Sequence, residues 1–223
     1  MMKHRVLAVG LAAVLTLGAS VPAFAGMVAT ENYPAEITIT ICQDSPTMFT
    51  DEQLSELAAT APDISETRSA MTIPDRRITD AELTAWSDEY WELGGINAFE
   101  LEVVRLINIE RAVYGLHPLA LNPTLSMAAR FHSHQMADLV FFSHRSPHHG
   151  SSTDRAEMFG HESIQEHVWG VRENIAGSTR SPERVVYVWM NSPGHRAAIL
   201  QEHFLTIGIG VVQGGGTTAK FGS

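Results

Sequence analysis

The sequence is poor in cysteine, and it lacks several patterns that would have narrowed its function. Cys42 is the single cysteine among 223 residues, so no intramolecular disulfide can form and the fold must depend on its hydrophobic core. No HExxH motif occurs, and this removes the shortest signature of a catalytic zinc site. Beyond the N-terminus, no apolar run approaches the length of a membrane helix.

Basic residues are scarce in the first half of the chain. Residues 26–104 contain 16 acidic and 3 basic residues, whereas residues 105–223 contain 9 acidic and 10 basic ones. The net charge of the whole sequence is −10. Because nucleic acids require a basic surface, we expect no nucleic-acid partner, and we interpret the acidic part as a solvated face.

The N-terminus has the pattern of a secretory signal peptide over residues 1–25. Lys3 and Arg5 precede a short apolar run, Val6–Leu17, and Ala23–Ala25 fits a small-x-small cleavage site. The apolar run is too short to span a bilayer, and no cysteine for lipid attachment follows the cleavage site. We therefore expect a secreted, extracellular protein without a transmembrane anchor.

Residues 26–78 are predicted to form an acidic extension or linker with extended and helical pieces. The alternation in Ile37–Ile41 predicts a strand, and a capping box at Thr50 predicts a short helix through Ala59. A second capping box begins an amphipathic helix within residues 79–95. We expect this helix to dock on the following domain through an apolar stripe of Leu83, Trp86, Tyr90 and Leu93.

The main domain is predicted to cover residues 97–223. Apolar periodicity and caps predict four helices, and alternation predicts a strand in FLTIGIGVV with another in the last residues. The stretch between Val140 and Arg180 is irregular, with a short strand near Val168. Helices on both sides of a small antiparallel sheet are the simplest layering. The four helices are expected over Phe99–Val113, from Pro123 after the cap Asn122, over Ser181–Met190, and from Pro193 after the cap Ser192.

Of the 11 histidines, 10 follow residue 116, and most have ordinary interpretations. His132 lies on the apolar face of its predicted helix and is interpreted as a core residue with satisfied hydrogen bonds. His134 points off that face and is assigned to solvent. His148 and His149 fall in a loop rich in glycine and serine.

His144 and His195 stand apart from the other histidines. His144 follows an apolar run that would hold its loop against the core, and His195 lies in the first turn of a capped helix. The dipole of that helix lowers the pKa of His195 and favours a neutral ring. Between them, Glu173 is followed by Asn174. Two imidazoles and a carboxylate could hold a zinc ion with an open position, or let the carboxylate act as a base toward water.

Five segments in a fixed order carry a family resemblance. They read LINIERAVYGLHPLALNPTLSMAARFHS, FFSH, ENIAG, VVYVWMNSPGHRAAIL and FLTIGIGVV. Together they resemble the CAP superfamily, which includes cysteine-rich secretory proteins, antigen 5 and plant pathogenesis-related proteins, and most of all its bacterial branch. The resemblance implies an α+β fold, a three-layer α-β-α sandwich whose central cleft holds two histidines and two acids.

The motifs place the implied cleft residues on this chain. His144 and His195 match the two histidines, and Glu173 matches the acid before Asn174. The fourth position departs, because Ser192 stands where many eukaryotic members carry glutamate. Arg172 also stands where glycine is common. The resemblance therefore implies a His-Glu-His core without the second acid.

The family's Asn-x-x-Arg stretch corresponds to Asn108–Arg111. A buried arginine must find a carboxylate or carbonyls, so we interpret Glu110 and Arg111 as a structural brace.

Three functions follow, in order of preference. The first is a secreted, monomeric binding module whose cleft takes a lipid, a peptide, a cell-wall component or another small molecule, or a divalent cation such as Zn²⁺, without turnover. The second is a metal-assisted hydrolase with His144 and His195 as ligands and Glu173 as base. The third is a polar cluster that only stabilises the loops over the sheet.

Overall fold

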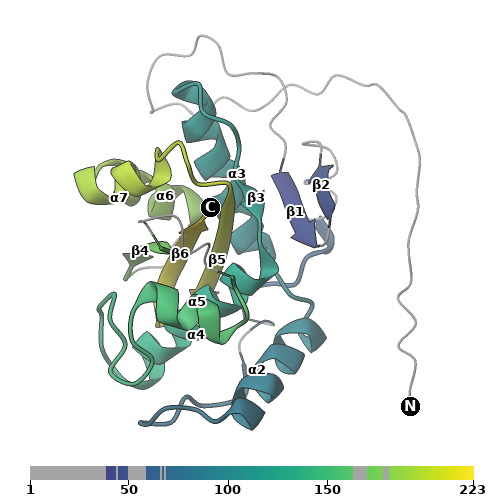
Figure 1. The fold of residues 1–223 in the computed structure, drawn as a ribbon, viewed down its shortest axis with the longest axis vertical. Helices are drawn as coiled ribbons and strands as arrows, with labels where there is room; N and C mark the ends of the chain where they lie inside the picture. Colours follow the sequence, from purple (N-terminus) through teal and green to yellow (C-terminus); the bar gives the residue numbers. More distant parts are fainter. Residues whose placement is uncertain are drawn as a thin grey trace. The chain divides into compact units, whose positions relative to one another are not determined.

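A six-stranded mixed sheet organises the part of the chain that the computed structural model describes (Figure 1). The order of strands across the sheet is β2-β1-β3-β5-β6-β4. Pairing is antiparallel except at β3, which runs parallel to both β1 and β5. The sheet predicted to be antiparallel is thus mixed. The strands are β1 Ile39–Gln43, β2 Ser45–Phe49, β3 Ala120–Leu121, β4 Arg172–Ala176, β5 Thr206–Val212 and β6 Gly216–Gly222.

The described residues are 39–43, 45–49, 59–65, 67, 69–162, 170–177 and 181–223, all within the unit Tyr33–Ser223. Three predictions lie outside them: the signal peptide, the short strand near Val168, and the helix from Thr50 except its last residue. Of the strand predicted over Ile37–Ile41, the described part belongs to β1. The division between linker and domain stays a prediction.

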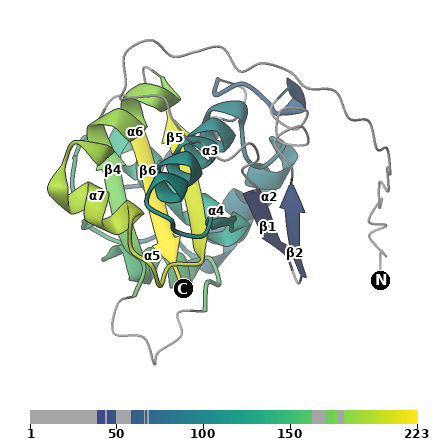
Figure 2. The ribbon, with the colours of Figure 1, turned by 90° about the horizontal axis from the view of Figure 1, so that it is seen from above.

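Helices cover both faces of the sheet, which confirms the α-β-α sandwich (Figures 1 and 2). On one face lie α3, α6 and α7, and on the other lie α4 and α5. α5 and β4 both fall between Val140 and Arg180, in the stretch predicted to be irregular. The helices are α2 Asp80–Glu92, α3 Ala98–Val113, α4 Pro123–Asp138, α5 Ser152–Met158, α6 Pro182–Met190 and α7 Pro193–Ile199.

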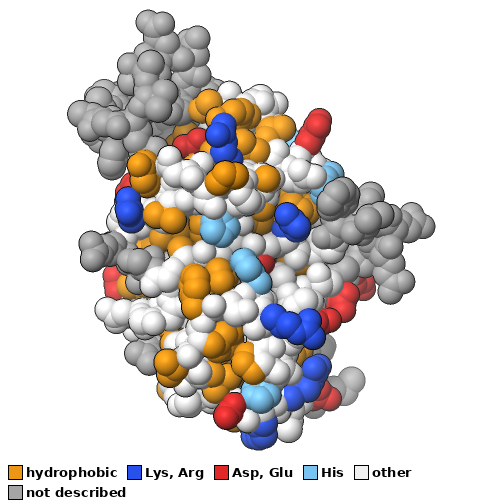
Figure 3. Space-filling view, turned by 90° about the vertical axis from the view of Figure 1, so that its left-hand side faces the viewer, with side chains coloured by type: hydrophobic (Ala, Val, Ile, Leu, Met, Phe, Trp, Pro, Cys, Tyr) orange, Lys and Arg blue, Asp and Glu red, His pale blue; other side chains and the backbone are white. Residues whose placement is uncertain are grey.

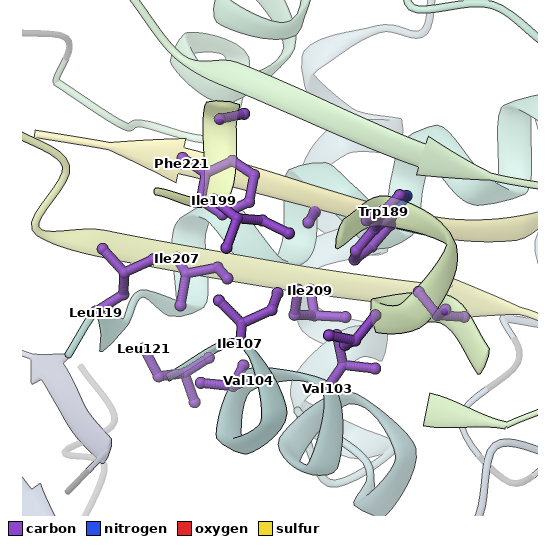
Figure 4. Packing of buried hydrophobic residues seen from close by; sticks show 14 of the residues in the cluster. Val103, Val104, Ile107, Leu119, Leu121, Trp189, Ile199, Ile207, Ile209 and Phe221 are labelled. Atoms are coloured by element: carbon purple, nitrogen blue, oxygen red, sulfur yellow. The ribbon is translucent and has the colours of Figure 1, made fainter. Parts of the chain in front are cut away.

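The main hydrophobic core lies between the sheet and the α3–α6–α7 layer (Figure 4). Val104 and Ile107 of α3 meet Ile207 and Ile209 of β5, and Trp189 of α6 completes the cluster. All five side chains are 0% exposed. The alternation in β5 places these isoleucines on one face of the sheet.

Helix α4 packs directly against the opposite face of β5. A Cβ atom at Gly208 would lie 2.2 Å from the carbonyl carbon of Leu125, and one at Gly210 would lie 1.9 Å from the nitrogen of Arg130. Glycine at both positions therefore lets the helix backbone touch the strand. Every α4 residue from Leu125 to Met136 is buried.

Two of the predicted caps form and a third differs. Thr79 closes a capping box with Glu82, and the side chains of Asn122 and Ser181 accept backbone N–H groups of α4 and α6. Ser192 occupies the N-cap position of α7, but its side chain makes no capping hydrogen bond. The prediction for Ser192 is thus right about the N-cap position and wrong about the capping hydrogen bond.

The aromatic residues of α2 contact α4. The Trp86 ring packs edge-on against Phe131 at 5.4 Å and against His134 at 4.8 Å, and the Arg130 guanidinium lies 4.5 Å from the centre of the Tyr90 ring. The assignment of His134 to solvent is wrong, because α2 covers that side of α4 and leaves the histidine 1% exposed. Among the described residues, no helix is long and apolar enough to cross a membrane.

Candidate functional site

Three elements bring the candidate side chains together. His144 lies in the loop after α4, Glu173 lies on β4, and His195 lies in the first turn of α7. The loop starts with Val140, whose φ of 53° is in the left-handed region that β-branched residues avoid. Such a conformation costs on the order of 1–3 kcal/mol, so tertiary contacts must hold this turn.

Glu173 fixes the ring of His144. The distance from Nδ1 of His144 to Oε1 of Glu173 is 3.1 Å. The glutamate side chain is 2% exposed, whereas that of the histidine is 55% exposed. Because an ionised carboxylate only accepts hydrogen bonds, Nδ1 is the donor, and a neutral His144 carries its lone pair on Nε2. Glu173 thus orients His144 and sets its tautomer.

Two buried cations share the other oxygen of Glu173. Nη2 of Arg155 lies 2.7 Å and Nζ of Lys220 lies 2.8 Å from Oε2. Both cationic side chains are 0% exposed. Arg155 also donates to the carbonyls of His144 and Gly150. The glutamate is therefore engaged at both oxygens.

The pKa values of this cluster reflect one carboxylate that is paired with two cations. Burial opposes ionisation of Glu173, but Lys220, the hydrogen bond from His144 and the charge of Arg155 hold its pKa well below the usual value. Burial lowers the pKa of Lys220 to about 8, since the attraction of Glu173 is offset by repulsion from Arg155. The carboxylate is charged at neutral pH, and the two cations outnumber it.

His195 lies beside His144 at the start of α7. Its backbone carbonyl accepts a hydrogen bond of 3.0 Å from the side-chain amide of Asn174, which ties α7 to β4. Within the described part of the chain, its Nδ1 is buried without a hydrogen-bond partner. Burial, followed by repulsion from His144, lowers its pKa. The ring is therefore neutral at neutral pH. The sequence predicted the same direction from the helix dipole, whereas burial and His144 cause it in the structure.

An apolar groove of about 540 Å³ ends at His195. Figure 3 views the molecule from the side on which α7 and β4 lie in Figure 1, and it shows histidine side chains among hydrophobic ones. The groove combines the loop before His144, the end of β4 and one side of α6. Its walls are Phe142, Ile175, Ala176, Gly177, Arg184, Val185, Val188 and His195.

A chain of hydrogen bonds supports the His144 loop from behind. Nε2 of His132 lies 3.0 Å from the carbonyl of Ser143, and the Gln135 amide lies between Nδ1 of His132 and Nδ1 of His149. Nε2 of His149 accepts the N–H of Ile78 at 3.0 Å.

The donors and acceptors of this chain fix both tautomers. The Ser143 carbonyl requires N–H at Nε2 of His132, and the Ile78 N–H requires a lone pair at Nε2 of His149. We therefore assign the Gln135 oxygen to His149 and its nitrogen to His132. Burial lowers the pKa of His132 and of His149 to about 4. His149, predicted in an ordinary polar loop, is instead 1% exposed.

The predicted brace forms through carbonyls. Arg111 is fully buried and donates to the backbone carbonyls of His117, Ile199 and Gln201. Among the ion pairs between described residues, none joins Arg111 to Glu110. Burial raises the pKa of Glu110, which is partly exposed. Arg111 therefore connects α3 to the end of α7 without its neighbour.

The donor set fits a protein-bound zinc ion poorly. Among the described residues, no three His, Cys, Asp or Glu side chains are grouped to hold a metal ion. Glu173 is already bound by two cations, and Ser192 replaces the second acid. His144 and His195 alone are fewer than the three protein ligands of a catalytic zinc site.

Sequence reasoning missed the partners of Glu173. Arg155 and Lys220 are 18 and 47 residues away from it along the chain. One signal was present: Lys220 lies between Ala219 and Phe221 in a strand whose residues are all buried. A lysine in such a strand needs a buried partner.

The sandwich and its groove define an α+β domain of a recognisable class. The family model described as "CAP: Cysteine-rich secretory protein family" matches residues 104–221. The match covers more than half of the sequence, so the chain belongs to this family, and the resemblance stated from the motifs is confirmed.

Individual relatives are bacterial. The protein YkwD of Bacillus subtilis (strain 168) is 45% identical over 120 residues, which are 54% of this chain and 45% of that protein. The membrane protein YlbC of the same strain is 35% identical over 127 residues, 57% of this chain and 35% of that protein. The chain spans less than half the length of these curated relatives.

A solved structure supports the same fold. It is that of an extracellular protein containing an SCP domain from Bacillus anthracis str. Ames, with a TM-score of 0.53 and 30% sequence identity. The similarity covers 60% of this chain and 43% of that chain. This likeness agrees with the α+β sandwich described above.

Proposed function

We propose that this chain is an extracellular binding module of the CAP family. Its ligand lies in the groove, with an apolar part against Phe142 and Val188 and a polar group beside His144 and His195. The observation that carries the proposal is that the apolar groove ends at His195, whose pKa is lowered by burial, and that Glu173 orients the ring of His144. Apolar walls with few polar groups at one end are typical of small-molecule sites.

Secretion is supported by two observations of different kinds. The N-terminus has the pattern of a signal peptide. The similar Bacillus anthracis protein is described as extracellular. Both agree with a ligand from outside the cell, such as a lipid, a peptide or a cell-wall component.

Binding of an eight-carbon probe tests the groove. We expect octanoate or octanamide to bind the purified protein in calorimetric titrations. Val188→Asp places a charge in the apolar wall and should weaken binding about tenfold or more. Val113→Asp is the matched control, because Val113 is also exposed but lies at the end of α3. Equal effects of the two substitutions on binding would contradict the proposal.

One observation favours a second candidate, a hydrolase. The Glu173–His144 pair presents Nε2 of an oriented imidazole, which is the arrangement of a general base toward water. The p-nitrophenyl ester of octanoic acid tests it, because its cleavage should then depend on both His144 and Glu173. If the protein is only a binding module, the ester should be hydrolysed at the same rate with and without the protein.

A further inference from the structure

The buried charges behind His144 do not balance. Glu173 supplies one negative charge, whereas Arg155 and Lys220 supply two positive charges, and all three side chains are at most 2% exposed. The nearby His132 adds no charge, because burial holds its pKa at about 4. Among the described residues, this cluster therefore carries one positive charge in excess.

The excess charge lies directly against the His144 loop. Nη2 of Arg155 donates to the His144 carbonyl at 3.1 Å, and the same guanidinium contacts the carboxylate that binds the His144 ring. Carbonyl groups of Gly150 and Ser152 also accept from the two cations, but as neutral dipoles they leave the net charge unchanged. A buried charge acts over several ångströms because little water screens it.

The groove itself adds no compensating negative charge. Its described wall includes one cation, Arg184, and no acidic residue. Asp154 interacts with Arg155, but it is exposed and also faces Arg145. Solvent screens such a group more strongly than the buried cluster.

We propose that the groove selects a carboxylate attached to an apolar chain, with the carboxylate beside His144 and His195. This inference rests on the proposed binding function and specifies the charge of its ligand. An anion there balances the excess positive charge, whereas a divalent cation adds to it. The same chemistry occurs at the C-terminus of a peptide that ends in apolar residues and in a free fatty acid.

Matched acids and amides test the charge preference. Octanoate is compared with octanamide, and N-acetyl-Leu-Leu with its C-terminal amide, by calorimetric titration at pH 7. We expect about tenfold tighter binding of at least one acid than of its amide. The pair that shows the larger ratio identifies the source as fatty acid or peptide.

Charge variants locate the cause of the preference. Lys220→Met leaves Glu173 and Arg155 as a balanced pair, so the acid-to-amide ratio should fall to about threefold or less. Arg105→Met is the control, since it removes a cation that pairs with Glu102 on the surface of α3, and it should keep the ratio. If Lys220→Met does not fold, Arg184→Gln in the groove wall should still lower the ratio.

The outcomes separate the two proposals. Equal binding of acids and amides, or tighter binding of the amides, overturns the selection of carboxylates and leaves the binding module intact. A ratio that Lys220→Met and Arg184→Gln both leave unchanged also overturns it. Absence of binding by all four probes overturns the binding function itself.

Discussion

Two buried glutamates of the same domain differ in their surroundings. Glu100 on α3 is 0% exposed and pairs with Arg130 alone, and its oxygens also accept the N–H groups of Asn97 and Val211. Glu173 on β4 is 2% exposed, pairs with two cations, and contacts the half-exposed ring of His144. The first cluster is balanced and closed, whereas the second is unbalanced and reaches the groove.

The difference separates a structural ion pair from a candidate site. Arg130 extends the first cluster to the Gly95 carbonyl and the Tyr90 ring, so every partner belongs to the framework between α2, α3, α4 and β5. Burial of a charge is costly in both places, and it is offset by pairing in the first. In the second, pairing leaves a charge that a ligand can neutralise.

The largest effect is expected from breaking the balanced pair. Glu100→Gln leaves the Arg130 guanidinium buried without its carboxylate, and this should reduce the free energy of unfolding by about 3–5 kcal/mol. Urea denaturation measures it. Arg130→Met combined with Glu100→Gln should recover part of the loss. A loss within about 0.5 kcal/mol for the single variant would contradict the structural role.

A smaller effect is expected at Glu173, whose loss strands two cations of which one can lose its proton. Glu173→Gln should reduce the free energy of unfolding by about 2–4 kcal/mol. Lys220→Met alone should change it by about 1 kcal/mol or less, because Arg155 keeps its partner. In the double variant the cost of Glu173→Gln should be smaller. Additive effects of the two changes would show that the groups are not coupled.

The pH dependence of stability is expected to come from the hydrogen-bonded histidines behind the His144 loop and not from the Glu100–Arg130 pair. His132 and His149 have pKa values of about 4 in the folded protein, below the value of about 6.5 in an unfolded chain. The unfolded state therefore takes up protons first, and stability should fall as the pH decreases from about 6.5 to 4. Urea denaturation at several pH values measures the slope.

A variant tests whether His149 contributes to that pH dependence of the free energy of unfolding. His149→Gln removes one of the two titrating groups, so the slope of the free energy of unfolding against pH should decrease by about one proton. His203→Gln is the control, since His203 does not belong to the chain of hydrogen bonds that runs from the Ile78 N–H to the Ser143 carbonyl. An unchanged slope in His149→Gln would refute the depressed pKa of His149.

The smallest effect is expected from an exposed hydrogen bond outside both clusters. His148 lies 2.7 Å from Asp75, whose side chain is 87% exposed. Because exposed pairs contribute little, Asp75→Asn should leave Tm within about one degree of the wild type. A larger decrease, measured by differential scanning calorimetry, would show that charge balance at the surface matters as much as burial.

Much of the fold could be predicted from local patterns. The caps at Thr79 and Asn122 and the alternation around Ile207 and Ile209 gave the right elements at the right places. The mixed sheet could not be predicted, because β3 has two residues and is paired only through contacts with distant strands. His134 was misplaced because its cover, α2, is a separate element.

The candidate site divides in the same way. By itself, the sequence determined which helices and strands form, since caps and periodicity depend on neighbouring residues. It also determined that His144 and His195 are the candidate histidines of the site, since the family motifs around them are local. Only the tertiary structure decided what Glu173 does. The antiparallel register sets Glu173 opposite Lys220, and the contact between α5 and β4 brings Arg155 to the same oxygen. The ionisation of a carboxylate and the ion pairs that it forms depend on groups that can be distant along the chain, because electrostatic interactions depend on separation in space.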